Sequence, residues 1–426
     1  MTTHTAANLT ASKPGAAAPP HALGKAVYNP FLPEFRQNPH PFLRRLREDD
    51  PVHYSSIMGV WLLTRYADAV SAMKDHQHFS ASTRHWKDHE RFFYRQDLGP
   101  NSPLSDVYNR WMLQLDPPDH TRLRALLNKA FTPRVVDAMA PSIQGVVDEL
   151  LDRVESRGSM DYIADFAYPL PVMVICDLMG IPREDQGKIE AWCRDLLPSF
   201  AAAVSRATVA DTNKSLAEFR DYFRDLTNKR RKDPKNDLLS GLIAARDQGD
   251  KLSDDELFAT CILLAFAGHA SAVQATVNTL VLLLRYPDEL AKLRRDPSLI
   301  ESTVEESLRF ESPLQIIFRT TTQETPIGGK VIPANQMVFV SLVAANRDPA
   351  QFSEPDRFDI TRKDNKHVAF GFNIHYCAGA PLGRAEAQIA TETVYRRFPN
   401  IRLQSETFDR EPSLILRGIR SLPVLF

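Results

Sequence analysis

The sequence predicts a mainly α-helical protein with small β-sheets, and three observations support this fold class. Over residues 120–312, apolar residues recur at spacings of three and four, which is the period of amphipathic helices. Alternation at 60–64, and further strand signals at 326–343 and 413–426, predict strands near both ends. No internal repeat or low-complexity linker divides the chain after its first residues, so we expect one domain over residues 27–426.

The amino-terminal segment differs in composition from the rest of the chain. Residues 1–26 are rich in Ala, Pro and Thr and contain neither an acidic side chain nor an apolar run. Because such a segment cannot offset its ordering entropy by burial, we expect a disordered leader. A transit peptide would carry more Arg, and no signal peptide is visible.

Charge and cysteine content narrow the class of protein further. The 426 residues carry a formal net charge of −1 and a pI near 6.9, which argues against nucleic acid as a partner. The four cysteines, Cys176, Cys193, Cys261 and Cys377, show no paired spacing. That pattern favours a reducing compartment over a disulfide scaffold, so we expect a cytoplasmic protein.

One stretch, residues 261–284, lacks Asp, Glu, Lys and Arg and is long enough to span a bilayer. However, polar residues such as His269 and Asn278 interrupt it, and three acidic residues at 254–256 precede it. Ser253, just before those acids, is a typical helix cap. We therefore expect a long helix buried in the core of the protein and no membrane association.

The segment 370–379 reads FGFNIHYCAG and places one cysteine, Cys377, in a loop suited to a tight turn. Gly371 and Gly379 permit backbone geometry that is closed to other residues, and Asn373 tolerates a left-handed conformation. His375 could place a donor at the edge of a flat ligand. A thiolate bound to iron favours cleavage of an O–O bond. A glycine-rich turn with a buried cysteine is the simpler alternative. It does not explain why so many consecutive residues of this segment suit a loop that holds a metal-bound thiolate.

This run resembles the haem-binding loop of the cytochrome P-450 superfamily, the haem-thiolate monooxygenases, which is usually written F-x-x-G-x-H/R-x-C-x-G. Asn373 stands where the family has its middle glycine. The resemblance covers nearly all of residues 27–426 and implies the single fold of the family, with haem b buried between the long central helix and the cysteine loop. It makes Cys377 the axial iron ligand. The other cofactor-binding residues that it implies in the loop and the facing helix are Phe370, Gly371, Gly379 and Ala267.

A second motif follows Pro117 and Pro118, where Asp119 resembles a helix start. His120 and Arg124, four residues apart, would share one face of that helix. The resemblance implies that they bind the haem propionates together with Arg319 and His375, through charge-assisted hydrogen bonds. A solvated amphipathic helix is the alternative.

A third motif is the pair Glu306 and Arg309 on a predicted helix, where a spacing of three allows the two charges to pair. Taken alone, it could be an ordinary surface ion pair of little energetic weight. In the family, the motif pairs with a basic residue in a later irregular segment, and Arg357 stands at the matching place. The resemblance therefore implies a buried Glu306–Arg309–Arg357 network with a structural role beneath the haem.

The centre of the uncharged helix carries the most consequential departure from the family. There the family reads A/G-G-x-D/E-T, in which the acid and the alcohol help deliver protons. Here Gly268 leaves room for a flat ligand, Ala270 stands at the acid position, and Ser271 keeps a hydroxyl. Ala270 cannot relay a proton, so water, His269 or polar groups of the substrate would complete the relay. Use of peroxide, a different reaction, or a substitution that affects only packing are the alternatives.

Residues 84–111 and the residues after the Glu306–Arg309 helix are candidates for the substrate pocket. Such pockets are mostly apolar with a few placed polar groups. The candidate residues are Trp86, Phe92, Phe93, Leu314, Ile316 and Ile317. Packing in the core is the alternative for all of them.

The resemblance implies a monomeric, bacterial-type monooxygenase that inserts one oxygen atom from O₂ into a C–H or C=C bond of a small organic substrate. A separate ferredoxin-type partner and its reductase would supply electrons from NAD(P)H. The basic residues Arg122, Arg124, Lys129 and Arg134 suit an acidic partner, because complementary charge speeds encounter. A generic basic surface is the alternative for these residues. Family habit favours natural-product tailoring. A peroxide-driven, coupling, desaturating or decarboxylating enzyme, and a haem sensor or carrier without turnover, are the alternatives.

Overall fold

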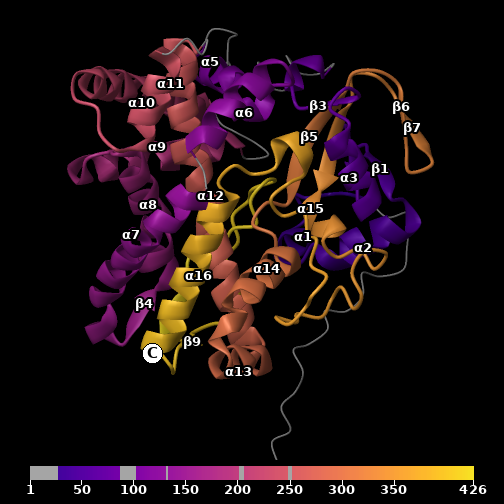
Figure 1. Cartoon of the computed structure of the whole chain (residues 1–426). Helices are drawn as coiled ribbons and strands as arrows, with labels where there is room; N and C mark the ends of the chain where they lie inside the picture. The colour runs from indigo at the N-terminus through magenta and orange to yellow at the C-terminus, as the bar shows by residue number, and fades with distance from the viewer. Residues whose placement is uncertain (1–26, 87–101, 131–132, 201–205, 248–251) are drawn as a thin grey trace, which may run out of the picture.

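The computed structural model describes residues 27–86, 102–130, 133–200, 206–247 and 252–426 (Figure 1). The predicted leader at residues 1–26 lies outside the described residues. Two candidates for the substrate pocket, Phe92 and Phe93, also lie outside them. The described chain consists mainly of helices with three small sheets, which confirms the predicted fold class.

The central element is α12 (Asp254–Arg285), which crosses the middle of the molecule (Figure 1). It begins with a capping box: the Ser253 hydroxyl accepts from the N–H of Glu256 at 3.2 Å, and the Glu256 carboxylate accepts from the N–H of Ser253 at 2.8 Å. Most residues between 257 and 283 are buried. The predicted long core helix is confirmed.

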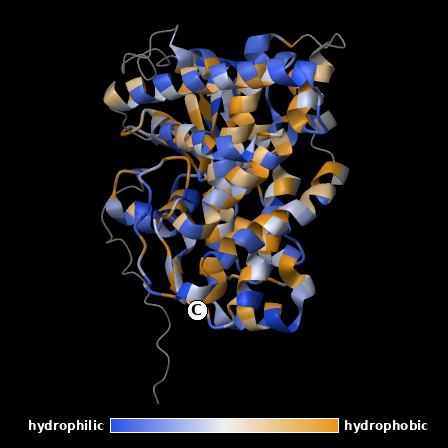
Figure 2. Ribbon diagram, turned by 90° about the vertical axis from the view of Figure 1, so that its left-hand side faces the viewer, coloured by the Kyte–Doolittle hydropathy of each residue, from blue (hydrophilic) through white to orange (hydrophobic). Residues whose placement is uncertain are grey.

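The helices that pack against α12 come from both halves of the chain. They are α5 (Pro103–Arg110), α8 (Pro169–Met179), α9 (Gln186–Leu196), α10 (Arg206–Lys232), α11 (Leu238–Asp247), α13 (Pro287–Arg295), α14 (Ile300–Phe310) and α16 (Ala380–Arg397). The other described α-helices are α1 (Pro33–Gln37), α2 (His40–Asp49), α3 (Tyr66–Lys74), α6 (Asp119–Ala130), α7 (Pro133–Asp152) and α15 (Leu342–Ala345). Figure 2 shows polar and apolar turns alternating along the outer helices, as expected for helices with one buried side.

The largest sheet has the strand order β1-β2-β8-β5-β3 and joins distant parts of the sequence. Its central strand β8 is buried throughout and reads MVFVS, the apolar run expected of a strand covered on both faces. β8 pairs in parallel with β2 and antiparallel with β5, with Arg319 opposite Val338. The strands are β1 (Val52–Ser55), β2 (Val60–Leu63), β3 (Phe79–Ser80), β5 (Ile316–Thr321) and β8 (Met337–Ser341).

Two smaller sheets complete the described structure. The first, in the order β4-β10-β9, brings the carboxyl end of the chain against a segment near its middle. The second is a hairpin of β6 and β7. Their strands are β4 (Ser159–Asp161), β6 (Thr325–Ile327), β7 (Lys330–Ile332), β9 (Arg402–Leu403) and β10 (Pro423–Leu425).

Two described helical stretches are long and apolar enough to cross a membrane: 162–179 and α12. In each, most of the apolar window is buried inside the protein, at 67% and 61% respectively. That burial is typical of core helices, because a membrane-spanning helix would instead turn apolar side chains outward to lipid.

Candidate active site

The cysteine loop lies between β8 and α16 and has the backbone geometry that its sequence predicts. Gly371 has φ +74° and Asn373 has φ +59°, so both occupy the left-handed region. The N–H of Cys377 donates to the carbonyl of Phe370 at 2.9 Å and closes the loop. Gly379 is the exception, because its φ of −84° is open to any residue; it lies just before α16. Asn373 thus replaces the family glycine without changing the turn.

The thiol of Cys377 reaches accessible surface at the end of this loop. Burial by the surrounding protein raises its pKa, while the N–H groups of Gly379 and Ala380 and the charges of Arg124 and Arg384 oppose that rise. These donors and cations all stabilise the anionic form. The loop therefore presents one sulfur with several groups that favour a thiolate.

One face of the otherwise buried α12 is open. Ala267 is exposed, and Leu264, Gly268 and Ser271 are partly exposed. These positions are spaced by three and four, so they form one stripe along the helix. Phe370 of the cysteine loop packs against an apolar cluster that includes Ala275 of α12, which brings the loop and the helix into one region. The stripe and the thiol thus belong to the same region of the molecule.

Four cationic or imidazole groups gather beside the cysteine loop, as the propionate motif predicts. His120, at the start of α6, lies with its ring centroid 4.2 Å from that of His375. Arg319 on β5 is buried, and its guanidinium donates to the carbonyl of Phe318 at 2.7 Å. Arg124 on α6 donates to the carbonyl of Tyr376 at 2.6 Å.

Burial and the neighbouring cations disfavour positive charge on the two imidazoles of this cluster. Burial, with help from Arg319, His120 and Arg124, lowers the pKa of His375 to about 2. Burial and Arg124 lower the pKa of His120 to about 4. Among the described residues, neither ring nitrogen of His120 has a hydrogen-bond partner, and the same holds for Nε2 of His375. Buried donors without acceptors indicate a binding surface for an anion.

The Glu306–Arg309 pair is fully buried, and Arg309 binds the carboxylate through two nitrogens at 2.7 and 2.8 Å. The third basic side chain is not Arg357, as the sequence predicts, but Arg362, whose Nε lies 3.1 Å from Glu306. Arg357 is half exposed and pairs with Glu354; only its carbonyl joins the network, accepting from Arg309 at 3.1 Å. Because the chain turns between residues 357 and 362, the side chain of Arg362, and not that of Arg357, reaches Glu306.

His269 does not face the open stripe of α12. It is buried, its Nε2 lies 3.1 Å from the carbonyl of Tyr168, and its ring meets that of Tyr168 edge to face. This contact fixes α12 against the start of α8 and leaves no path from His269 to the site. The sequence-based suggestion that His269 completes a proton relay is therefore wrong. Ser271 lies on the open stripe, and its hydroxyl donates to the carbonyl of Ala267 at 3.1 Å.

The substrate-pocket candidates divide into two groups. Trp86 and Ile316 are buried in an apolar cluster beside the largest sheet, together with Tyr28 and Phe339, which fits the packing alternative. Leu314 and Ile317 are only partly buried. Because side chains alternate along β5, Ile317 shares the sheet face of Arg319 and Ile316 faces the other way. Of the candidates on β5, Ile317 is thus the one on the side of the cationic cluster.

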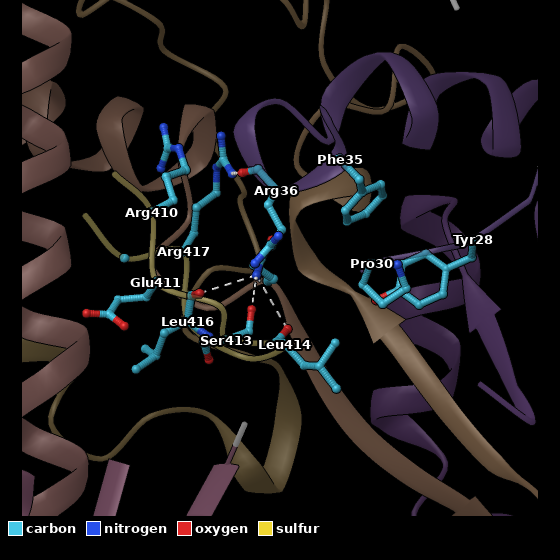
Figure 3. Close-up of a pocket in the computed structure, with 12 residues that line it drawn as sticks. Tyr28, Pro30, Phe35, Arg36, Arg410, Glu411, Ser413, Leu414, Leu416 and Arg417 are labelled. Atoms are coloured by element: carbon cyan, nitrogen blue, oxygen red, sulfur yellow. Dashed lines mark hydrogen bonds between the residues drawn. The ribbon is translucent and has the colours of Figure 1, made fainter. Parts of the chain in front are cut away.

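A small pocket lies between residues 28–36 and residues 410–418 (Figure 3). The amide of Gln315 donates to three carbonyls, those of Ser413, Leu414 and Leu416, at 3.1, 3.5 and 3.3 Å. Figure 3 marks these bonds by dashed lines that reach the three labelled residues. None of the predicted site residues lines this pocket. It is therefore separate from the cysteine-loop site.

Several residues of the site carry no signal in the sequence. Arg362 and Asn365 bind Glu306 but lie outside the two motifs that predict the network. Asp116, which accepts from the N–H of Ala81 at 3.0 Å, places a carboxylate beside the cationic cluster. These residues are far in the sequence from the groups that they contact, so only the fold shows that they meet. Patterns among neighbouring residues could not have found them.

The residues present fit a haem group. A flat ligand would lie between the thiol of Cys377 and the open stripe of α12, and its two carboxylates would meet the unpartnered ring nitrogens of His120 and His375 and the buried guanidinium of Arg319. The space beside Gly379 is also open, because a Cβ built there would meet no atom within 4 Å. These features define a haem-thiolate enzyme.

Comparison with known proteins agrees with this class. Residues 26–419 match the family described as Cytochrome P450. Cytochrome P450 CYP107DY1 of Priestia megaterium is 39% identical over 93% of this chain and 95% of its own. The polyketide biosynthesis cytochrome P450 PksS of Bacillus subtilis is 36% identical, over 94% of this chain and 99% of its own. A crystal structure of P450BioI with an acyl carrier protein ligated to hexadec-9Z-enoic acid is 38% identical with a TM-score of 0.85, covering 92% and 100%.

The chain belongs to the cytochrome P450 family, whose members are haem-dependent monooxygenases. The sequence-based prediction of the family, the fold and the class of enzyme is confirmed.

Proposed function

We propose that the protein inserts one atom of O₂ into a C–H or C=C bond of a small organic substrate, with two electrons from NAD(P)H delivered through a separate ferredoxin-type protein and its reductase. The second oxygen atom leaves as water with two protons. The observation that carries the proposal is the thiol of Cys377 beside the open stripe of α12.

The chain would hold haem through Cys377 at the iron and through His120, Arg124, Arg319 and His375 at the carboxylates. When bound, haem supplies activation of O₂ and transfer of oxygen to the substrate. The cations and N–H groups around Cys377 would favour an anionic sulfur against the burial that raises its pKa, and the cationic cluster would orient the ligand by charge-assisted bonds. Both interactions fix which face of the cofactor meets the stripe of α12.

On that stripe, Ser271 would present the hydroxyl nearest the reacting groups, while Ala270 offers no proton. We propose that water held by Ser271 supplies protons there, since its hydroxyl bonds only within the helix at present, to the carbonyl of Ala267. Ile317 on β5 and Leu314, two residues before that strand, would contact the substrate.

Fewer of the predicted basic residues are available to a ferredoxin-type partner than the sequence suggests. Arg122 pairs with Glu256 and Asp119, so little of its charge is left for an incoming protein. Arg124 bonds to the cysteine loop itself and would carry the contact with a ferredoxin-type partner. The side chains of Lys129 and Arg134 lie outside the described residues.

The relatives favour a role in natural-product tailoring. One is named for polyketide biosynthesis, and another was solved with an acyl chain held on a carrier protein. We propose that this chain acts on a comparable product of secondary metabolism, in the cytoplasm and as a monomer.

The central test uses Cys377→Ser and labelled O₂. The variant should lose the red-shifted absorbance of the reduced CO complex, and retention of that band would remove Cys377 as the ligand. A panel of compounds, screened by the spin-state change of the haem spectrum, would identify binders. Turnover with a ferredoxin, its reductase and labelled O₂ should then place one labelled atom in the product.

A second candidate function is peroxide-driven turnover, or a coupling, desaturating or decarboxylating reaction. Ala270 at the acid position favours it, because peroxide brings its own protons and electrons: one oxygen enters the substrate and the other leaves as water. Peroxide alone should then give product. No product with peroxide, where the ferredoxin system gives product, would exclude it. Ala270→Glu should raise the product formed per NAD(P)H consumed if proton supply is limiting.

A further inference from the structure

His76 lies two residues after the end of α3, at a point where α3 is fastened to the cysteine loop. The side-chain amide of Asn373 donates to the carbonyl of Lys74 at 3.1 Å. The ammonium of Lys74 lies 5.4 Å from the centroid of Phe372. Asn373 and His375 belong to the same short helical turn of that loop, so His76 follows directly on the contact between α3 and His375.

The imidazole of His76 has an unused donor or acceptor. Its Nδ1 is buried and has no hydrogen-bond partner among the described residues. The neighbouring acid does not serve it: both oxygens of Asp75 are taken by His78, through the N–H at 3.1 Å and Nδ1 at 2.6 Å. A buried polar atom without a partner is uncommon and requires an explanation.

The surroundings of His76 are those of the cationic cluster. A positive charge on His76 lowers the pKa of both His120 and His375, which places the three rings within electrostatic range of one another. Arg124 and Arg319 act on the same cluster, and Asp116 opposes them. Asp116 offsets part of the positive charge that Arg124 and Arg319 offer to the two carboxylates of haem. A further hydrogen-bond donor at this cluster would therefore contribute to binding.

We propose that His76 is a further binding residue of this site, and that its ring donates a hydrogen bond to a carboxylate of the cofactor. The proposal rests on haem binding by the Cys377 loop but not on the reaction or the substrate. Unlike His120, Arg124, Arg319 and His375, His76 belongs to none of the motifs of the sequence; the packing of α3 on the loop brings it to the cluster.

The test measures release of haem from the full-length holoprotein to an excess of apomyoglobin, without substrate or redox partner. His76→Leu should release haem about tenfold faster, the loss expected for one hydrogen bond to a charged group. His76→Asn, whose amide nitrogen lies near the position of Nδ1, should stay within about twofold of the wild type. The matched control is His78→Leu, because His78 is bound to Asp75, and it should leave the rate unchanged.

A second arm loads the same proteins with the dimethyl ester of iron protoporphyrin IX, which lacks both carboxylates. There, His76→Leu and the wild type should release the ligand at equal rates. A rate for His76→Leu equal to the wild type with ordinary haem, or a difference that persists with the ester, would overturn the proposal. If haem binds but turnover never occurs, the proposed function fails while this result stands.

Discussion

Two clusters of charged side chains flank the cysteine loop, and they differ in how their charges are matched. In the Glu306–Arg309–Arg362 network, every charged group has partners: Glu306 accepts from both arginines, and Arg309 also donates to the carbonyls of Asn346 and Pro355. In the cluster around His120 and His375, like charges repel, and both ring nitrogens of His120 and Nε2 of His375 have no hydrogen-bond partner in the described part of the chain. The first arrangement holds the fold together, while the second is completed only by an anion.

The largest effect should follow from breaking the matched network. Glu306→Gln leaves two buried guanidinium groups without their counter-charge, which costs about 3–5 kcal/mol in comparable pairs. We expect a large fall in the unfolding temperature and little soluble holoprotein. Thermal unfolding and the yield of haem-loaded protein would measure it.

The control for that variant is the neighbouring residue. Glu305 is 28% exposed and pairs with the equally exposed Arg384 and with the buried His367, so Glu305→Gln should destabilise the protein less than Glu306→Gln. Equal losses from the two variants would mean that complete burial of the Glu306 network has no special weight.

Glu386 on α16 extends the comparison to a buried acid without a partner. It is buried, its Oε2 has no hydrogen-bond partner among the described residues, and burial raises its pKa to about 8. Between pH 4.5 and 8, the folded protein keeps a proton that the unfolded chain loses, so wild-type stability falls as the pH rises through this range.

Glu386→Gln removes that dependence. The variant should gain on the order of 2–4 kcal/mol over the wild type at pH 8, and the gain should vanish near pH 4.5. Unfolding temperatures across this range would show the trend, with Glu392→Gln on the same helix as the control. A gain independent of pH would show that Glu386 does not titrate in this range.

The unmatched cluster should respond in the opposite way to the network. Arg319 is buried, burial lowers its pKa to about 10, and no described carboxylate lies within ion-pair distance. Arg319→Gln should therefore stabilise the apoprotein while weakening haem retention by about tenfold or more. Apoprotein unfolding and haem release would be measured together; loss of apoprotein stability would assign Arg319 to the scaffold.

Although only the resemblance to the family placed the distant residues Arg319 and His375, the sequence was sufficient for the cofactor class because the thiolate loop and the pair His120 and Arg124 are local: residues within a few positions meet by helix or turn geometry. It was sufficient for Glu306 and Arg309 for the same reason. The pairing with Arg357 failed because the partner comes from an irregular segment, where neither period decides which side chain turns inward. His269 failed similarly, since the helical period alone does not say which neighbour covers each face.

The smallest effect concerns the arginine that the network excludes. Arg357 is half exposed and pairs with Glu354 at 3.1 Å, so Arg357→Gln should change stability by less than about 0.5 kcal/mol. Arg362→Gln should cost several times more, because Arg362 binds Glu306 and also donates to the carbonyl of Ser353 at 2.8 Å. Unfolding temperatures of the two variants test the exchange directly. If Arg357→Gln is the more damaging, the side chain of Arg357 turns inward in solution and the order of the two arginines is reversed.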